Sequence, residues 1–227
     1  MTFATATTNY LFSAGDTIFE SGGLRSSAVV EPTTNGLGPR PTRGIFAYHV
    51  CTKISDIRDG TSNTIMMAEH VVASFITGRK PTARLVEGVS WDTASQQQLS
   101  ANPGICLAQR NGLNYANPAR VKGYFGNYLF GGDPERSWFQ TVIGPNGPSC
   151  CSGGSEGGNC VTTIIAPSSY HPGAVNGLMA DGSVRFISQT IDTGNLSAPE
   201  PRGGGPSPYG VWGAMGSKAG GDARAEL

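Results

Sequence analysis

Charged residues are scarce in this chain. Lysine, arginine, aspartate and glutamate together make up 14% of the 227 residues, whereas about 25% is usual in soluble domains. The 16 basic residues balance the 16 acidic ones, so the formal net charge is zero. A neutral chain without a basic stripe has no means of displacing the counterions of phosphates, which excludes a nucleic-acid-binding protein.

Long apolar runs are also missing. No stretch approaches the roughly 18 residues that a membrane-spanning helix requires. The first residues, MTFATATTNYLF, have neither the basic start nor the apolar centre of a signal peptide. From the sequence we therefore expect no signal peptide and no transmembrane segment in this chain.

Glycine and proline are plentiful instead. Their 33 and 15 residues make up about a fifth of the chain, against average usages of roughly 7% and 5%, which indicates many turns. Short runs rich in Tyr, Phe, Ile, Val and Thr lie between the turns and favour strands. We expect strands over residues 8–15, 44–50, 63–72, 84–92 and 138–144.

The sequence thus predicts a β-dominated α+β fold, an antiparallel sheet of short strands with long loops. Residues 95–120 are polar and rich in Asn and Pro, and are expected to form a long surface excursion with little regular structure. Residues 192–227 have almost no apolar periodicity and are expected to form a loosely ordered Gly/Pro-rich tail. The rest, residues 1–191, is predicted to be a single β-rich domain with its own core.

Three of the five cysteines fall in one Gly/Ser-rich segment, GPNGPSCCSGGSEGGNC. Cysteines in such a loop favour disulfides in an oxidising compartment over buried thiols. A zinc site is the weaker alternative, because there is neither Cys-x2-Cys spacing nor a nearby histidine pair. The pairing stays open, and the odd number leaves one thiol over. The disulfide candidates are Cys51, Cys106, Cys150, Cys151 and Cys160.

The stretch SSYHPGAVNGLMADGSVRFI, residues 168–187, predicts a hairpin. Asp181-Gly182 is a preferred pair for a two-residue type I′ turn, in which both positions need positive φ. With such a loop Met179 faces Val184, and the side chains of Met179, Val184 and Phe186 are expected on the core side.

A second turn precedes this hairpin. His171-Pro172-Gly173-Ala174 fits a type II turn, in which Pro fixes φ and Gly supplies positive φ. An extended strand from there to Asp181 would hold His171 and Asp181 about 20 Å apart, so a direct pair is disfavoured. We expect His171 to make a hydrogen bond that pins the Pro-Gly turn against the sheet.

The stretch KISDIRDGTSNTIMMAEHVV carries several short polar side chains before a predicted strand. Asp59, Thr61, Ser62 and Asn63 are expected to satisfy backbone groups of their own turn. Glu69 and His70 are neighbours on the strand and point to opposite faces. At most one of them can share a site with His171, so zinc is poorly supported there.

Four stretches resemble one family in the same order. His171, nine residues and then Asp181-Gly182 with SVRFI resembles the C-terminal signature of the prepilin-type surface proteins, abundant in planctomycetes, that carry domain of unknown function 1559. ISDIRDGTSNTIMMAEH is similar to that family's DGTSNT…E motif, WFQTVIGPNGPSC to its PN…SC segment, and TNYLFSAG to its NY…G strand. The resemblance covers roughly residues 8–187.

The resemblance implies a pilin- or pseudopilin-like head at the cell envelope or outside the cell. Family members look like type IV pilins and pseudopilins, with a cleaved prepilin leader, a hydrophobic N-terminal helix and a β-rich head. The leader, the helix and the first part of the head are absent from this chain. It implies a non-enzymatic structural or interaction module, no catalytic residues, other envelope or pilin-like subunits as partners, and membrane contact only through the helix. A Cys-Pro segment upstream in the family would account for the odd cysteine. The motif residues are Asp59, Gly60, Thr61, Ser62, Asn63, Glu69, His171, Pro172, Gly173, Asp181 and Gly182.

Two other function classes remain open. GGSEG, residues 153–157, matches the G-x-S-x-G pattern of serine hydrolases. A secreted esterase-like enzyme would use Ser155 as nucleophile, His171 as base and Asp181 or Asp133 as the orienting acid. A calcium-dependent adhesin or carbohydrate-binding head would take oxygen ligands from Asp133 and Glu135 in GGDPER, although no Asp-x-Asp-x-Asp run is present. No other cofactor is expected.

Overall fold

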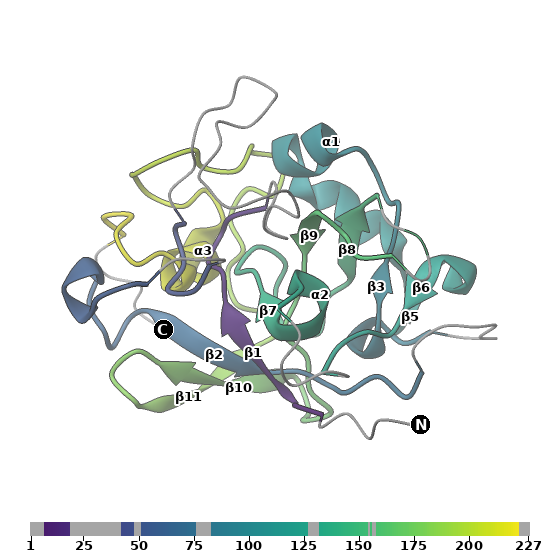
Figure 1. Ribbon diagram of the computed structural model, residues 1–227, viewed down its shortest axis with the longest axis horizontal. Helices are drawn as coiled ribbons and strands as arrows, with labels where there is room; N and C mark the ends of the chain where they lie inside the picture. Colours follow the sequence, from purple (N-terminus) through teal and green to yellow (C-terminus); the bar gives the residue numbers. More distant parts are fainter. Residues whose placement is uncertain are drawn as a thin grey trace.

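The computed structural model describes residues 7–18, 42–47, 51–75, 83–126, 132–153, 155 and 158–222. Within these residues the chain forms a five-stranded sheet in the order β11-β10-β2-β1-β7, a four-stranded sheet in the order β6-β3-β8-β9, and a small hairpin of β4 and β5. Figure 1 places the first sheet at the lower left of the molecule and the second at its right. The predicted α+β, β-dominated fold is confirmed. The expectation of a purely antiparallel sheet is wrong, since β1 pairs with β7 and β3 with β8 in parallel.

The elements are short. The five-stranded sheet consists of β1 (Tyr10–Ser13), β2 (Ile65–Glu69), β7 (Trp138–Phe139), β10 (Ala174–Met179) and β11 (Val184–Ser188). The four-stranded sheet consists of β3 (Val89–Ser90), β6 (Val121–Lys122), β8 (Ser149–Ser152) and β9 (Thr162–Ile164). The remaining strands and α-helices are β4 (Arg110–Asn111), β5 (Asn114–Tyr115), α1 (Gln96–Ala101), α2 (Pro134–Ser137) and α3 (Gly210–Gly216). Four 3-10 helices cover Ile54–Asp56, Leu85–Glu87, Pro103–Gln109 and Pro118–Arg120.

The strands expected in 8–15 and 63–72 are confirmed as β1 and β2. The strand expected over 84–92 is wrong in its first half, where Glu87 N donates to Arg84 O and closes a 3-10 turn. Only Trp138–Phe139 of 138–144 is strand. Residues 44–47 contain no strand, and the rest of 44–50 lies outside the described residues.

Two polar segments that we expected to lack regular structure are ordered and partly buried. In 95–120, Ser95 and Gln98 form a reciprocal capping box that starts α1, and Leu99 and Cys106 are fully buried. This Ser-x-x-Gln signal is visible in the sequence. The expectation of a surface excursion is therefore wrong for α1 and for the 3-10 helix after it.

The expectation of a loosely ordered tail is also wrong for residues 192–222. They carry α3, whose Trp212 is fully buried, stacks on Phe139 with ring centroids 6.1 Å apart, and donates its indole N–H to Ile143 O at 3.0 Å. Tyr209 and Trp212 are both fully buried, and each aromatic ring removes a large area from water, which favours packing of this Gly/Pro-rich segment against the core. The tail is part of the same packed unit as the sheet.

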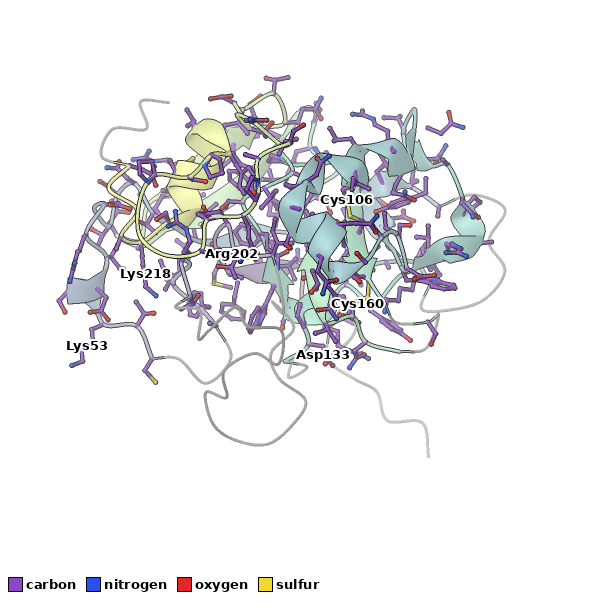
Figure 2. All side chains as sticks on the ribbon, turned by 90° about the horizontal axis from the view of Figure 1, so that it is seen from above. Lys53, Cys106, Asp133, Cys160, Arg202 and Lys218 are labelled. Carbon is purple, nitrogen blue, oxygen red and sulfur yellow. A yellow bond between two sulfur atoms is a disulfide. The ribbon has the colours of Figure 1, made fainter. Side chains whose placement is uncertain are left out.

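Disulfides are confirmed, with the pairs Cys106–Cys150 and Cys151–Cys160, while Cys51 is an exposed free thiol. Figure 2 labels Cys106 and Cys160, one member of each pair. The cysteine loop itself was misjudged, since Cys150 and Cys151 lie side by side on the buried strand β8. Neighbours on a strand point to opposite faces, and each disulfide accordingly lies in a different core cluster.

The hairpin forms, but its predicted register is off by one residue. Leu178, not Met179, pairs with Val184, and Gly182 alone has positive φ (88°). Gly182 N donates to Met179 O, and Met179 N donates to Ser183 O. This is a three-residue loop, a type I turn closed by a Gly bulge, rather than a type I′ turn.

The register decides which side chains are buried, because a slip of one residue exchanges the two faces. Met179 is buried as expected, but the expected core positions Val184 and Phe186 are 66% and 64% exposed, and Ile187 is buried in their place. The inner face of the sheet is formed around Leu11, Ala68, Val175, Met179 and Ile187, with Trp212 and Met215 of α3 in the same cluster.

Candidate functional site

The motif residues converge on β2, which lies between β1 and β10. The DGTSNT…E motif surrounds this strand, and the His…Asp-Gly motif surrounds β10. The two motifs are therefore neighbours along the whole length of the strand pair, and each end of β2 has its own set of contacts.

At the first end, residues 59–64 form a turn held by its own side chains. Asn63 Nδ2 donates to Asp59 O (3.1 Å), and Thr64 Oγ1 donates to Gly60 O (3.0 Å), while Gly60 has φ 96°. The carboxylate of Asp59 accepts from the backbone N–H groups of Gly220 (2.6 Å) and Gly221 (3.0 Å). The expectation that Asp59 satisfies its own turn is therefore wrong, because its carboxylate binds a segment near the end of the chain that nothing local in the sequence signals.

The Asp-Gly turn of the hairpin docks on the same turn. Ala180 N donates to Thr64 O (2.8 Å), and Asp181 N donates to Thr61 O (3.1 Å). The carboxylate of Asp181 accepts from the backbone N–H and the hydroxyl of Ser183, and these hydrogen bonds lower the pKa of Asp181. The carboxylate thus caps its own turn.

At the second end of β2, Glu69 joins three groups. Its carboxylate accepts from Asn176 N (2.8 Å) and Asn176 Nδ2 (2.9 Å), and His171 Nε2 lies 3.5 Å from Glu69 Oε1. The imidazole is 54% exposed, and Gly173 has the positive φ (73°) that a type II turn requires at that position. The structure therefore places His171 beside Glu69, at the end of β2 opposite to the Asp181 turn.

His70, the neighbour of Glu69, points into the protein. Its Nδ1 lies 2.8 Å from Val71 O and 3.2 Å from Ser168 Oγ, and its ring contacts Phe125 with centroids 3.9 Å apart. Ser168 Oγ accepts from Val71 N and donates to Val86 O (2.8 Å). Burial lowers the pKa of His70 to about 4 because the charged ring loses its hydration.

The residues of the hydrolase hypothesis are not brought together by any contact among the described residues. β10 runs from the His171 turn to the Asp181 turn, and the Asp181 carboxylate is engaged by Ser183. Ser155 is exposed, and its carbonyl accepts from Gly158 N. Part of the G-x-S-x-G segment lies outside the described residues.

The two carboxylates of the calcium hypothesis are each paired with a basic side chain. Asp133 lies 3.2 Å from Arg136 Nε. Glu135 lies 3.2 Å from Lys122 Nζ, and the side chains of Glu135 and Lys122 are fully buried. Glu135 also accepts from Cys160 N (3.0 Å). Across the described part of the chain, no three His, Cys, Asp or Glu side chains are grouped so that they could hold a metal ion.

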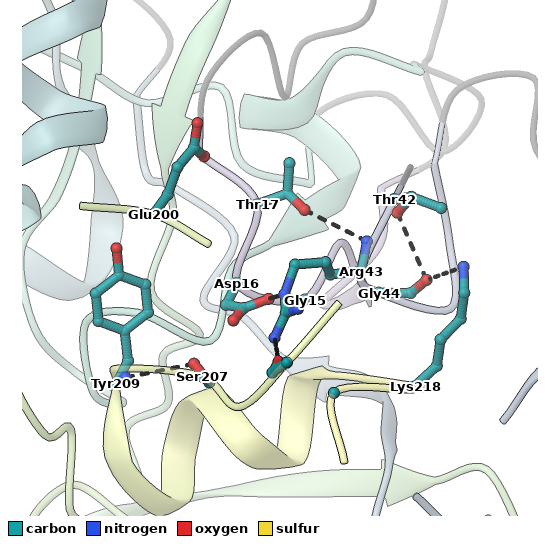
Figure 3. Close-up of polar contacts among 12 residues, drawn as sticks. Gly15, Asp16, Thr17, Thr42, Arg43, Gly44, Glu200, Ser207, Tyr209 and Lys218 are labelled. Carbon is teal, nitrogen blue, oxygen red and sulfur yellow. Dashed lines mark hydrogen bonds and ion pairs between the residues drawn. The ribbon is translucent and has the colours of Figure 1, made fainter. Parts of the chain in front are cut away.

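A further buried polar cluster was missed by sequence reasoning (Figure 3). Arg43 Nε donates to Asp16 (2.7 Å), and the two terminal nitrogens of Arg43 donate to the carbonyls of Gly203 and Gly205. Glu200 accepts from Ile18 N at 2.6 Å. The residues are separated by up to 182 positions, so no local pattern points to them. They fasten the end of β1 to the segment before α3.

The outer face of the five-stranded sheet is largely apolar, and Tyr10, Phe12, Val184 and Phe186 are exposed on it. Two rows of side chains cross it, given by the strand register as Phe12, Met67, Leu178, Val184 and as Tyr10, Glu69, Asn176, Phe186. Phe12 and Tyr10 are 37% and 45% exposed, and Phe12 packs edge-on against Phe46. An exposed apolar patch of this kind on a folded protein usually marks an interaction surface.

These features define a β-rich, disulfide-bonded domain whose motif residues hold the sheet together. The chain belongs to the family described as protein of unknown function (DUF1559), whose model matches residues 4–194. No curated protein and no solved structure matches the chain. No helix in the described part of the chain has the length and apolar character to cross a membrane.

Proposed function

We propose that this chain is the head of a pilin-like protein of the cell envelope or the cell exterior, and that it serves as a structural or interaction module without catalytic activity. The observation that carries the proposal is the engagement of the motif carboxylates. Those of Asp59, Glu69 and Asp181 all accept hydrogen bonds from the chain itself. A catalytic carboxylate must instead reach a substrate or a reacting proton.

Two further features support an interaction module outside the cytoplasm. Disulfides persist in oxidising compartments and are rare in the cytosol, and this chain has two. The apolar outer face of the sheet offers a contact surface for other envelope or pilin-like subunits. Contact with the membrane would be made by the apolar helix that the family resemblance implies.

The catalytic alternative is tested with a short-chain ester. Turnover of p-nitrophenyl butyrate by the purified chain should not exceed the buffer rate, and Ser155→Ala and His171→Ala should leave the signal unchanged. A turnover that both substitutions abolish would contradict the proposal and establish the serine hydrolase.

The location is tested on native cells. Fractionation with antibodies against the chain should find it in the envelope or the medium, and protease added to intact cells should digest the envelope-bound part. Recovery in the soluble cytoplasm with reduced cysteines would overturn the proposed location.

A further inference from the structure

The edge of the five-stranded sheet is open at β11. This strand is the last in the sheet order, and among the described residues its outer side pairs with no other strand. Figure 1 shows it at the lower margin of the molecule. An open edge carries unpaired N–H and C=O groups, which are a template for another strand.

The hydrogen bonds at the two ends of β11 fix which groups point outward. Met179 N donates to Ser183 O, and Gln189 N donates to Gly173 O, both at 2.8 Å. Inward and outward backbone groups alternate in an antiparallel ladder, so the odd-numbered residues bond β10 and the even-numbered ones point their backbone groups away from the sheet. These outward residues are Val184, Phe186 and Ser188. Ser188 O already accepts from Ile191 N (3.1 Å), and its second lone pair stays available to a partner strand.

The outward residues are also the ones that expose apolar side chains. Val184 and Phe186 are 66% and 64% exposed on the outer face. Natural edge strands are commonly protected by lysine, proline or a bulge, and within the strand sequence VRFIS the only charge is Arg185, which points to the other face. The edge therefore offers both hydrogen bonds and apolar contact to a partner strand.

We propose that β11 pairs with β11 of a second copy of this chain, antiparallel about a two-fold axis beside Phe186. In this register Phe186 lies opposite Phe186 of the second copy, Val184 lies opposite Ser188, and Arg185 lies opposite Ile187. All five residues of the strand are paired. The two sheets become one, and their apolar outer faces become continuous.

Charge and overlap select this register over its two neighbours. A shift of one step brings Arg185 opposite Arg185 of the second copy, and like charges directly opposite are destabilising. The shift in the other direction leaves Val184 and Arg185 opposite residues beyond the end of the strand. Only the register centred on Phe186 pairs the whole strand and keeps the two guanidinium groups apart.

The pairing is tested by the mass of the 227-residue chain in solution. Sedimentation or light scattering over a concentration series should show a dimer that dissociates on dilution. Phe186→Lys places two ammonium groups opposite each other and should raise the dimer dissociation constant at least about tenfold. A chain that is monomeric at every concentration, or a dimer that Phe186→Lys leaves intact, would overturn the proposal.

Phe12→Lys is the matched control. Phe12 lies on the same outer face but on the interior strand β1, so the dimer should persist while the apolar face is disrupted. A dimer lost in Phe12→Lys as well would place the interface on the face rather than the edge and overturn the pairing. Unchanged melting temperatures of both variants would exclude misfolding as the cause. Because the proposed function concerns the face, and this pairing the edge, either can fail without the other.

The register is tested by crosslinking in a Cys51→Ser background, which removes the free thiol. Residues directly opposite in a hydrogen-bonded antiparallel pair lie about 5.5 Å apart at Cα, within the span of a disulfide. A mixture of Val184→Cys and Ser188→Cys chains should form a crosslinked dimer on mild oxidation, and Leu113→Cys, exposed elsewhere, should not. The register is contradicted if the Val184→Cys and Ser188→Cys mixture crosslinks no more than Leu113→Cys, or if neither sample crosslinks.

Discussion

Asn176 donates two hydrogen bonds to the carboxylate of Glu69, which lies 107 residues earlier in the chain. One oxygen accepts from the backbone N–H and the other from the side-chain amide, so both are engaged by a single residue of β10. Hydrogen bonds to charged groups contribute more to stability than neutral ones. This contact therefore accounts for the position of a glutamate at the end of β2.

Replacement of that carboxylate should destabilise the fold more than loss of the adjacent imidazole. Glu69→Gln is expected to lower the free energy of unfolding by about 2 kcal/mol, because the amide cannot accept at both positions. His171→Ala should cost less than about 1 kcal/mol, since the imidazole is half exposed. Urea denaturation at pH 7 measures both, and a larger effect of His171→Ala would show that the assignment of their roles is wrong.

The free energy of unfolding should fall on mild acidification because of the buried His70. Well above pH 6.5 the ring is neutral in both the folded and the unfolded chain. Between pH 6.5 and about 4 the unfolded chain binds a proton that the folded chain excludes, because burial lowers the pKa of His70 to about 4. The loss over this window is about 3 kcal/mol from this group. Denaturation curves at pH 7 and 4.5 measure it, with His70→Gln as the control that should flatten this part of the pH dependence.

The two disulfides should contribute unequally. Cys106–Cys150 closes a separation of 44 residues and Cys151–Cys160 one of 9. In the chain-entropy description, their removal as Cys-to-Ser pairs costs about 4 and about 3 kcal/mol respectively. Thermal denaturation of the two double variants should therefore rank Cys106→Ser with Cys150→Ser as the less stable. The opposite ranking would mean that contacts made by the sulfur atoms, rather than loop closure, dominate.

The bulge in the hairpin turn should require glycine. Gly182→Ala is expected to cost about 1 kcal/mol, because its φ of 88° is a conformation that a side chain disfavours. Gly203→Ala provides a control, since a Cβ there meets nothing and its φ is not positive. Melting temperatures of the two variants measure the difference, and equal values would argue against the Gly bulge.

The sequence predicted what depends on local pattern. β1 and β2 follow from runs of β-branched and aromatic residues, and the Asp-Gly pair correctly indicates a hairpin. The alternation of exposed and buried residues in β11 was assigned to the wrong face, because Asp-Gly suits both a two-residue and a three-residue loop. Only the packing of Ile187 and Met179 against the inner core distinguishes them.

Long-range contacts account for most of what the sequence did not predict. Asp16 and Arg43 form a buried pair, and Asp59 binds the backbone of Gly220 and Gly221, without any repeated spacing that would signal either contact. The ordered tail depends on Trp212 finding Phe139, which lies in a different part of the chain. For the motif residues, the sequence indicated that they were structural, but not that Glu69 was the neighbour of His171.

The position of two adjacent cysteines on β8 determines which partner each of them can reach during oxidative folding. Cys150 faces the cluster that holds Cys106, and Cys151 faces the one that holds Cys160. To exchange partners, β8 would have to turn every side chain to the opposite side and so mix the contents of both cores. The geometry of β8 thus selects the native disulfide pairs. A chain that is oxidised before β8 has docked is the one that can form non-native disulfides.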